Sequence, residues 1–336
     1  MESTPVPLAS VAVCVVTHDC EADVEPLLRS LAALEHPRLE LIVVDSGSTD
    51  GTASRLRSAA IALPFVFEEA GENIGFAAGM NRALGLTAAD WILALNADAR
   101  PEPNFLSLLL ARAARHPDLA VGAVTGRLRR PARPGEPPRL DACGMYLTMS
   151  WRHHDRGSEA IDGGAFREPG RVFGSTGAAL LLRRAALDDV AVGGHIFAEE
   201  FHSYREDAEL AFRLRERGWE ILYEPAAGAE HRRVNTPRRR RAMPPHVNYH
   251  SLKNRYLLRA YHQGPANFVL TFLPTLLRDL AALAWVLLRE RGSLAVYGWL
   301  WRHRREILAR RRALRARRSA PQRDVDRWFW TRSLPL

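Results

Sequence analysis

Cysteine and lysine are scarce in this sequence of 336 residues, which contains three cysteines and a single lysine, Lys253. Cys14, Cys20 and Cys143 form no CxxC pair and no even set. They therefore argue against a disulfide framework or a zinc site and favour a reducing compartment. The first ten residues, MESTPVPLAS, also lack the basic segment and apolar stretch of a secretory signal. We expect the domain that follows to remain in the cytosol.

The charge is distributed unevenly, although 47% hydrophobic and 25% charged residues are typical of a globular protein with a sizeable core. From position 232 to the end there are 24 basic and 5 acidic residues, a net charge of +19. The preceding 231 residues contain 23 basic and 33 acidic residues, a net charge of −10. This asymmetry predicts a catalytic body with an appendage that seeks anions.

The first hundred residues alternate short apolar runs with segments of helical spacing. Continuous apolar strands separated by helices indicate a parallel sheet covered on both faces, and therefore an α/β fold. The expected strands are 11–17, 39–45, 64–69 and 91–96, and the expected helices are 24–34, 51–60 and 76–85. Later segments predict a loop at 127–139, a helix at 206–217, a strand at 219–223, a mobile stretch at 232–243 and helices beyond about 248.

Polar residues close several of these strands. Thr17 ends the first strand, Asp45 ends the second, and Asn96 and Asp98 lie at the end of the fourth. In parallel sheets, ligands bind beyond the carboxyl ends of the strands. The shared placement therefore predicts a ligand site at this edge.

Asp45 lies in the motif VVDSGSTDGT, where a carboxylate at a strand end is followed by a turn rich in glycine, serine and threonine. Such a carboxylate could accept a hydrogen bond from N3–H of a pyrimidine base. The alternative is an ordinary turn in which Thr49 or Asp50 caps the next helix.

The segment LNADA places Asn96 and Asp98 on one tight turn. A diphosphate leaving group needs a divalent cation, and Mg²⁺ binds through one or two carboxylates together with phosphate oxygens and water. The two side chains can therefore face a metal-bound diphosphate, although a simple polar turn has the same pattern. His231, which follows the last core strand, is either a further ligand or a structural histidine.

Two more segments contain residues that could take part in binding or catalysis. In ENIGFAAGMN, Gly75 and Gly79 permit close backbone approach, and the helix that follows would offer its N-terminus to phosphate, although no Walker or dinucleotide fingerprint is present. In EDAELAFRLRERGW, Glu206 and Asp207 open a helix. A carboxylate at a helix N-terminus stays ionised near neutral pH, as a general base must. An ordinary acidic first turn is the alternative.

The order of these motifs is more specific than any one of them. The chain contains, in sequence, Thr17, VDSGSTDGT, ENIGFAAGMN, LNADA, FGSTGAALLLRR and EDAELAFRLRERGWEILYEP, followed by His231. This series resembles the family-2 glycosyltransferases of the GT-A fold, particularly their bacterial rhamnosyltransferase-like branch, over residues 10–260. The resemblance implies an inverting transfer from a nucleotide-sugar donor to a hydroxyl of a lipid-linked or cell-envelope glycan. It implies Mg²⁺ or Mn²⁺ as the cofactor, and dTDP-rhamnose as one candidate donor.

The resemblance also implies roles for single residues. Asp207 would be the catalytic base, Glu206 would shape the acceptor pocket, and Asp98 and His231 would bind the metal. The first acid of the family's DxD motif is Asn96 here, so Asp98 and His231 would have to provide more of the metal site. The donor-binding candidates are Thr17, Asp45, Ser46, Asn73, Gly75, Gly79, Asn96, Asp98 and Gly177.

The segment 268–288 is apolar enough to be mistaken for a transmembrane span. Pro274, Arg278 and Asp279 argue against one, because a central Arg or Asp costs roughly 2.5–3.5 kcal/mol on insertion scales. Its apolar residues form one helical stripe, made of Leu276, Leu277, Leu280, Leu283, Ala284, Leu287 and Leu288. We expect a helix that lies on an anionic membrane surface, with nearby tryptophans and the basic cluster 302–318 among the headgroups. Packing on the catalytic domain is the main alternative. A nucleic-acid-binding tail is disfavoured, because no nucleic-acid module is visible.

The expected organisation is an N-terminal tail at 1–9, a GT-A catalytic domain at 10–245, a helical membrane-surface extension at 246–320 and a C-terminal tail at 321–336. The expected location is the inner face of a bacterial plasma membrane. Two rival functions differ in class. A sugar-phosphate nucleotidylyltransferase would need a glycine-rich basic loop after the first strand, where this chain reads THDCEADVE. A non-catalytic membrane-associated binding protein would not need Asp98, Asp207 and His231.

Overall fold

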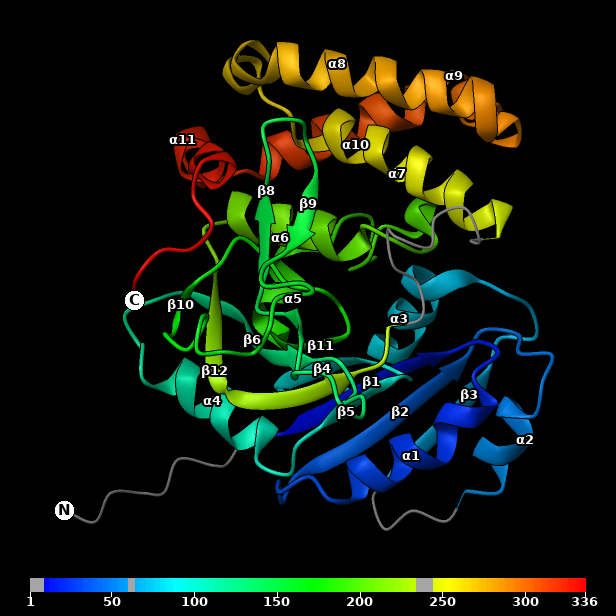
Figure 1. Ribbon diagram of the computed structural model, residues 1–336, viewed down its shortest axis with the longest axis vertical. Helices are drawn as coiled ribbons and strands as arrows, with labels where there is room; N and C mark the ends of the chain where they lie inside the picture. Colours follow the sequence, from blue (N-terminus) through cyan, green and yellow to red (C-terminus); the bar gives the residue numbers. More distant parts are fainter. Residues whose placement is uncertain (1–8, 60–63, 234–243) are drawn as a thin grey trace.

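The computed structural model describes residues 9–59, 64–233 and 244–336. In this part of the chain, a mixed sheet of ten strands forms the centre of the body (Figure 1). One half of the sheet is parallel, in the order β3–β2–β1–β4. Its strands are β1 (Val11–Thr17), β2 (Leu39–Asp45), β3 (Phe65–Glu69) and β4 (Trp91–Asn96). These bounds confirm the predicted strands, with a difference of one residue at the start of β3.

Alternate residues of these strands meet different layers of helices. Ala12 and Cys14 belong to the core shared with α3, whereas Val13 and Val15 belong to the core shared with α1 and α4. Because both faces are covered, the strands appear in the sequence as continuous apolar runs. The helices here are α1 (Glu21–Ala32), α2 (Thr52–Arg57), α3 (Gly75–Gly85) and α4 (Phe105–Ala114).

Beyond β4 the sheet becomes mixed. β11 (Ala179–Arg183) runs antiparallel to both β4 and β6 (Val121–Arg129), while β12 (Glu220–His231) runs parallel to β6. Short strands extend this half, namely β5 (Ala99–Pro101), β7 (Leu140–Ala142) and β10 (Gly170–Arg171). The strand expected at 219–223 is therefore longer than predicted. The loop expected from 127 begins later, because β6 continues to Arg129 alongside β12.

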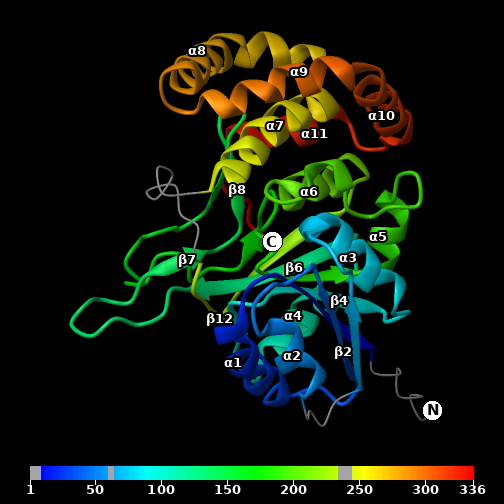
Figure 2. The same ribbon diagram turned by 90° about the vertical axis from the view of Figure 1, so that its right-hand side faces the viewer.

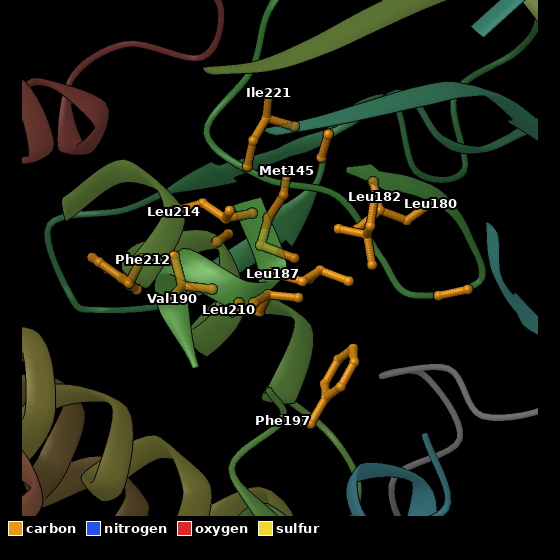
Figure 3. Packing of buried hydrophobic residues seen from close by; sticks show 14 of the residues in the cluster. Met145, Leu180, Leu182, Leu187, Val190, Phe197, Leu210, Phe212, Leu214 and Ile221 are labelled. Atoms are coloured by element: carbon orange, nitrogen blue, oxygen red, sulfur yellow. The ribbon is translucent and has the colours of Figure 1, made fainter. Parts of the chain in front are cut away.

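α5 (Arg184–Val190) and α6 (Glu206–Glu216) cover the upper face of this mixed half (Figures 1 and 3). Figure 3 shows Leu187 and Val190 of α5 packed with Leu210 and Leu214 of α6. The predicted apolar face of α6 is buried as expected. The contact between α5 and α6 holds the start of α6 over the sheet.

A small hairpin stands between the sheet and the C-terminal helices (Figures 1 and 2). It consists of β8 (Met145–Leu147) and β9 (His153–Asp155), which pair antiparallel. Its turn is bound to the helices above, because Trp151 Nε1 donates to Asn267 Oδ1 over 2.9 Å and Thr275 Oγ1 donates to the Met149 carbonyl over 3.3 Å.

Four helices form a layer above α6 (Figure 2). They are α7 (Pro245–His262), α8 (Pro265–Arg289), α9 (Ala295–Arg302) and α10 (Arg304–Arg317), with η3 (Arg291–Leu294) between α8 and α9. The helical character expected beyond 248 is present, and the stretch expected to be mobile falls mostly at 234–243, outside the described residues. We call α7–α10 the cap.

The segment 321–336 was expected to be a tail, and this prediction is wrong. α11 (Gln322–Asp326) and η4 (Arg327–Phe329) pack against the body, where Trp328 is fully buried and lies edge-on to Phe173. Leu334 also exchanges backbone hydrogen bonds with Arg171 beside β10. The large apolar surface of Trp328 and Phe329 explains why this segment is folded onto the domain.

α8 turns its polar side toward the protein and its apolar side outward. Asn267, Thr271 and Thr275 are buried on the inner side, where Asp279 also forms ion pairs with Arg255 and Arg259 of α7. The predicted stripe lies on the outer side, and the large exposed residues there are Phe268, Val269, Leu270, Phe272, Leu273, Leu276, Leu277, Leu280, Leu283, Leu287 and Leu288. Among the described residues, α8 is the one helix with a length and composition sufficient to cross a bilayer, which by itself is weak evidence.

Candidate active site

Thr17 and Asp45 are register partners at the ends of β1 and β2, as the sequence predicted. Thr17 Oγ1 donates to Asp45 Oδ1 over 2.8 Å. Ser48 donates through its backbone N–H to Oδ2 over 2.9 Å and through its hydroxyl to Oδ1 over 2.6 Å. A carboxylate has about four acceptor positions, so these three bonds fix the orientation of Asp45 and leave capacity for one further donor.

Ser46 and Asn73 connect this turn to the loop before α3. The Gly75 N–H donates to Ser46 Oγ over 3.1 Å and to Asn73 Oδ1 over 3.0 Å. Gly75 has a φ of +77°, and a Cβ there would collide with the ring of His202. This position therefore requires glycine for both reasons.

The N-terminus of α3 is not free for phosphate, so that prediction is wrong. Besides Gly75, the N–H of Phe76 donates to Ser203 Oγ over 3.2 Å, and the N–H of Ala77 donates to the His202 carbonyl over 3.0 Å. The turn before α6 thus satisfies the donors that a phosphate would need.

Gly79 is also not placed to meet a ligand. It lies inside α3 and is buried, and a Cβ at this position would come within 2.7 Å of Val16 Cγ1. Its small size allows α3 to pack closely on β1. Gly79 is therefore a packing residue, and the structure does not support its assignment to donor binding.

His231, the last residue of β12, lies between two carboxylates. Its Nε2 is 3.2 Å from Asp98 Oδ1, and its Nδ1 is 2.7 Å from Asp141 Oδ2. Burial alone would lower the pKa of His231, but hydrogen bonds to Asp141 and Asp98 and the charges of both raise it above its usual value. Burial opposes ionisation of Asp98, and the hydrogen bond and charge of His231 nevertheless hold the pKa of Asp98 below its usual value. The structure thus brings the predicted pair, Asp98 and His231, together. It also places Asp141, which was not predicted, against His231.

Asp98 and His231 suit a divalent cation. Two ligands at about 2.1 Å from one ion and at a right angle are about 3 Å apart, close to the observed 3.2 Å. Asp141 would then support the imidazole from behind, as carboxylates commonly do for histidines that bind metals. No group of three or more candidate ligands occurs within residues 9–59, 64–233 and 244–336. Two protein ligands completed by phosphate oxygens and water are typical of Mg²⁺.

Asn96 lies at the end of β4, where its backbone N–H donates to the Ala178 carbonyl over 3.0 Å. Its amide side chain is half-buried, and no hydrogen bond of that side chain occurs in the described part of the chain. Asn96 therefore sits beside Asp98 as predicted, with a neutral side chain that remains available to a ligand.

Glu206 and Asp207 open α6. Asp207 Oδ2 accepts from the Gly177 N–H over 3.3 Å, and Oδ1 accepts from the Ala208 N–H over 2.7 Å. Burial raises the pKa of Asp207 to about 6, and the neighbouring charge of Asp155 adds to this effect. Burial also raises the pKa of Glu206 well above its usual value, with Asp207 as the second cause. Of the two carboxyl groups, Asp207 is therefore the one with a pKa just below neutrality, while Glu206 is harder to ionise than an ordinary glutamate.

Arg233 and Asp155 lie between the Asp98–His231 pair and Asp207. Arg233 Nη2 lies 2.5 Å from Asp155 Oδ2, and Arg233 Nε lies 3.4 Å from Asp141 Oδ1. Asp155 enters the site from the end of β9, so the hairpin supplies part of the active-site charge. Asp141, Asp155 and Arg233 were not predicted from the sequence, since none of them belongs to a local motif.

The turn before α6 is strained. Three non-glycine residues in the four positions before Glu206 have positive φ angles, namely His202 at 61°, Tyr204 at 71° and Arg205 at 73°. Residues held in this region cost on the order of 1–3 kcal/mol each and persist only where their surroundings determine them. The strain lies directly before Glu206 and Asp207.

Asn254 of α7 holds this turn from above. The fully buried Asn254 Nδ2 lies within 2.9 Å of three carbonyl oxygens, those of Phe201, Ser203 and Tyr204. Arg205 Nε also donates to the Ser251 carbonyl over 3.4 Å. The cap therefore contributes directly to the position of Asp207.

Known proteins are similar to this chain in sequence and in fold. Residues 12–190 match the family model described as glycosyl transferase family 2. The chain belongs to this family. It is 29% identical over 277 residues to an N-acetylglucosaminyl-diphospho-decaprenol L-rhamnosyltransferase of Mycobacterium tuberculosis, which covers 75% of this chain and 85% of the relative. It is 25% identical over 209 residues to a poly-β-1,6-N-acetyl-D-glucosamine synthase of Staphylococcus aureus, a match that covers 61% of this chain and 45% of the relative.

Solved structures show that this family-2 glycosyltransferase has the GT-A fold. The mannosyltransferase PcManGT from Pyrobaculum calidifontis, in complex with GDP-Man and Mn²⁺, has a TM-score of 0.52 at 22% identity, covering 95% of this chain and 79% of that one. S. aureus TarS 1–349 with UDP-GlcNAc has a TM-score of 0.55 at 16% identity, covering 95% of this chain and 89% of that one. The predicted fold and the glycosyltransferase activity are confirmed.

Proposed function

We propose that this glycosyltransferase inverts the anomeric centre of a nucleoside-diphosphate sugar, L-rhamnose being the candidate, and transfers it to a hydroxyl of a lipid-linked glycan. The observation that carries the proposal is Asp207, a buried carboxylate with a pKa of about 6 at the start of α6. Asp155 and Arg233 lie between it and the Asp98–His231 pair. The M. tuberculosis relative, named for a rhamnosyl transfer to a diphospho-decaprenol acceptor, supports the choice of sugar and acceptor.

On the acceptor side, Asp207 would remove the proton of the attacking hydroxyl. A pKa near 6 keeps this carboxylate ionised at neutral pH and close to the pKa that is optimal for proton transfer. The Gly177 N–H holds Oδ2, so the orientation of the base is set before the substrate arrives. Glu206, whose pKa burial raises, would help to shape the acceptor pocket beside Asp207.

On the donor side, Asp45 would accept from the nucleobase, while Asp98 and His231 would bind Mg²⁺ or Mn²⁺. The cation would neutralise the charge that develops on the leaving diphosphate. Asp141 holds the His231 ring, so the metal-binding nitrogen keeps one direction. The proposed base opens α6, whereas Asp98 lies between β4 and β5 and His231 ends β12. With the two groups on separate elements, the acceptor oxygen would approach the anomeric carbon opposite the diphosphate, which leads to inversion.

The two faces of α8 support a location at the inner surface of a bacterial membrane. An amphipathic helix packed on a soluble body normally turns its apolar side inward. α8 does the reverse, and its inner side is held by hydrogen bonds and ion pairs. A contiguous apolar face of this kind marks an interaction site. The arginine-rich α10 beside it favours anionic lipids.

The test is acceptor-dependent release of nucleoside diphosphate from dTDP-rhamnose and related donors, with Mg²⁺ or Mn²⁺ and bacterial membranes present. The parent enzyme should release nucleotide only when the acceptor is supplied, and Asp207→Asn should not. Full turnover by Asp207→Asn would remove Asp207 as the base. Failure of the parent to bind any nucleoside diphosphate with metal in calorimetry would favour a non-catalytic binding protein.

A further inference from the structure

A groove in the cap, with a volume of about 740 Å³, contains none of the residues of the candidate active site. Its walls come from α7, the first turn of α8, the end of α9 and α10, which lie together in Figure 2. Sites for small molecules usually have volumes of about 300–1,000 Å³. Val269 and Leu308 line the groove and are exposed, so it opens at the protein surface. We call this cavity the cap groove.

The cap groove is continuous with the outward apolar face of α8. Phe268 and Val269 line the groove, and both are also among the exposed apolar residues of α8. An apolar molecule in contact with that face can therefore extend into the groove along the same side chains. Exposed apolar surface of this kind usually marks a binding site.

One face of α10 supplies both apolar and basic residues to the cap groove. Arg304, Ile307, Leu308, Arg311 and Arg315 line it at positions i, i+3, i+4, i+7 and i+11, the spacing of a single helical face. The two apolar residues thus lie between arginines along the helix. Among the described residues that line the groove, none is aspartate or glutamate.

Arg311 and Arg315 meet at the C-terminal end of α7. Arg311 Nη2 donates to the Gln263 carbonyl over 2.7 Å, and Arg315 Nη2 donates to the same oxygen over 3.2 Å. The two nitrogen atoms are therefore at most about 6 Å apart, close enough for one phosphate group to accept hydrogen bonds from both guanidinium groups. Each guanidinium has five N–H groups, and within the described residues only one other is used, by Arg311 toward the Ala260 carbonyl.

The positive charge at this end of the groove is incompletely neutralised. Within residues 9–59, 64–233 and 244–336, neither Arg311 nor Arg315 forms an ion pair with a carboxylate. Burial lowers the pKa of Arg311, and repulsion from Arg315 and Arg318 adds to this effect, while the attraction of Glu216 is weaker. A bound anion would relieve this repulsion.

The occupant must match both the apolar wall and this positive charge. A phospholipid with a net negative charge has an apolar chain and a phosphate in one molecule, and guanidinium groups bind phosphate through paired, charge-assisted hydrogen bonds. A second copy of the cap matches less well, because the net charge of +19 from position 232 onward would repel the same charge on its partner.

We propose that the cap groove binds one anionic phospholipid, with its phosphate held by Arg311 and Arg315 and an acyl chain lying between α10 and the first turn of α8. This inference rests on the proposed membrane location and deepens it. A general attraction to anionic membranes would involve all the arginines of α10, whereas a site in the groove requires only those that line it.

The first experiment uses a lipid that is not in a bilayer. Calorimetry at physiological salt would titrate dioctanoyl phosphatidylglycerol, below its micelle concentration, into the parent, Arg315→Glu and Arg312→Glu. Arg312 is exposed on the same helix and does not line the groove, so the two variants have the same net charge. The parent should bind one lipid per chain, and affinity should fall about tenfold or more in Arg315→Glu only, the effect of losing a charge-assisted bond. Equal nucleoside diphosphate binding with Mn²⁺ would show that both variants are folded.

The second experiment tests each part of the lipid. Dioctanoyl phosphatidylcholine should bind the parent at least tenfold more weakly, because its headgroup has no net charge. Glycerol 3-phosphate, which has the phosphate without acyl chains, should not compete at millimolar concentration. Leu308→Gln should weaken phosphatidylglycerol binding about fivefold through lost apolar contact, whereas Leu283→Gln, on α8 outside the groove, should not.

Several results would overturn the inference. An equal loss of affinity in Arg315→Glu and Arg312→Glu would show that the general charge of α10 attracts the lipid. No saturable binding by the parent, or equal affinity for phosphatidylcholine, would remove the anionic lipid, and displacement by glycerol 3-phosphate would indicate a site for free phosphate. A dimer in sedimentation that Leu308→Gln dissociates would assign the groove to a second copy.

Failure of the proposed function is distinguishable from failure of this inference. Loss of glycosyl transfer would leave the binding of monomeric lipid unchanged. Vesicle binding through the outer face of α8 is measured with different variants, so a negative result there would leave the measurement at the groove interpretable.

Discussion

The parallel half of the sheet and the cap place their apolar side chains in opposite ways. In β1 to β4, apolar residues face helices on both sides, and Asp45 and Asp98 lie at or just beyond the carboxyl ends of the strands. In α8, polar groups such as Thr271 and Asp279 face the protein, while leucines face outward. The first arrangement excludes water from a core, and the second presents an apolar surface to something outside the protein. Glu206 and Asp207 lie between these two regions, and their position depends on both.

Removing the proposed base, Asp207, should have the largest effect on activity, because this residue lies between the sheet and the cap. Asp207→Asn should lower kcat by roughly 10²- to 10⁴-fold, the usual contribution of a general base. Acceptor-dependent nucleotide release measures the loss. Asp188→Asn, at an exposed acid on α5, is the control and should be near normal. In the parent, kcat/KM should fall about tenfold per pH unit below about pH 6, where Asp207 becomes protonated. A profile that stays flat down to pH 5 would contradict the assignment.

Changing the outer face of α8 would test the second half of the comparison. Leu273, Leu277 and Leu280 are exposed, and replacing all three by Gln should weaken binding to phosphatidylglycerol vesicles about a hundredfold, at ~1 kcal/mol for each partly inserted side chain. Co-sedimentation measures this. Nucleotide binding should persist, and the control Leu86→Gln, at an exposed leucine after α3, should bind vesicles normally. Unchanged vesicle binding by the triple variant would mean that the face meets another partner.

The proposed metal-binding role of His231 can be tested through Asp141, which contacts His231 but belongs to no motif. Asp141→Asn should raise the Mn²⁺ concentration for half-maximal activity by about 10- to 100-fold, the usual range for a carboxylate that orients a metal-bound histidine. Metal titration of activity is the measurement, and Asp118→Asn, at an exposed acid after α4, is the control. If Asp141→Asn has the same metal requirement as the parent, His231 does not bind the metal.

A smaller effect should connect the cap to catalysis. Asn254→Ala removes the donor that holds the strained turn, so kcat should fall about tenfold through misplacement of Asp207, while the donor KM stays constant. Steady-state kinetics separate the two quantities. Asn104→Ala, at an exposed asparagine before α4, is the control. A change in donor KM with normal kcat would indicate that the turn serves the nucleotide instead.

The smallest effect concerns stability. The folded pKa of Asp207, about 6, lies above the value of ~3.9 for an unfolded aspartate, so stability is lost as pH rises between these values. Asp207→Asn should therefore increase Tm at pH 8 and have little effect at pH 4. Thermal unfolding at the two pH values measures the difference. A lower Tm at pH 8 would show that the charged carboxylate is stabilising.

The residues that could be predicted are those whose role depends on local sequence. Asp45, Asp98 and Asp207 each lie where a strand ends or a helix begins, and periodicity alone locates such points. Gly79 was misassigned because a glycine that permits packing cannot be distinguished in sequence from one that admits a ligand.

The residues that were missed depend on pairing between distant segments. Asp141 meets His231 across 90 positions, and Asp155 enters through a hairpin of two three-residue strands that is too short for a periodic signal. The burial of Trp328 likewise depends on a surface of the body that only the fold creates. Local patterns thus predicted the donor half better than the region between sheet and cap.

α7 has a further consequence because its neighbouring residues Asn254 and Arg255 serve different halves of the molecule. One side chain holds the turn that precedes the base, and the next is paired with Asp279 on α8. The helix thus connects the turn before Asp207, the proposed base, to α8, whose apolar face we propose rests on a bilayer. This connection would hold Asp207 at a fixed height above the membrane. We expect the enzyme to discriminate among acceptors by the height of the reacting hydroxyl above the membrane surface.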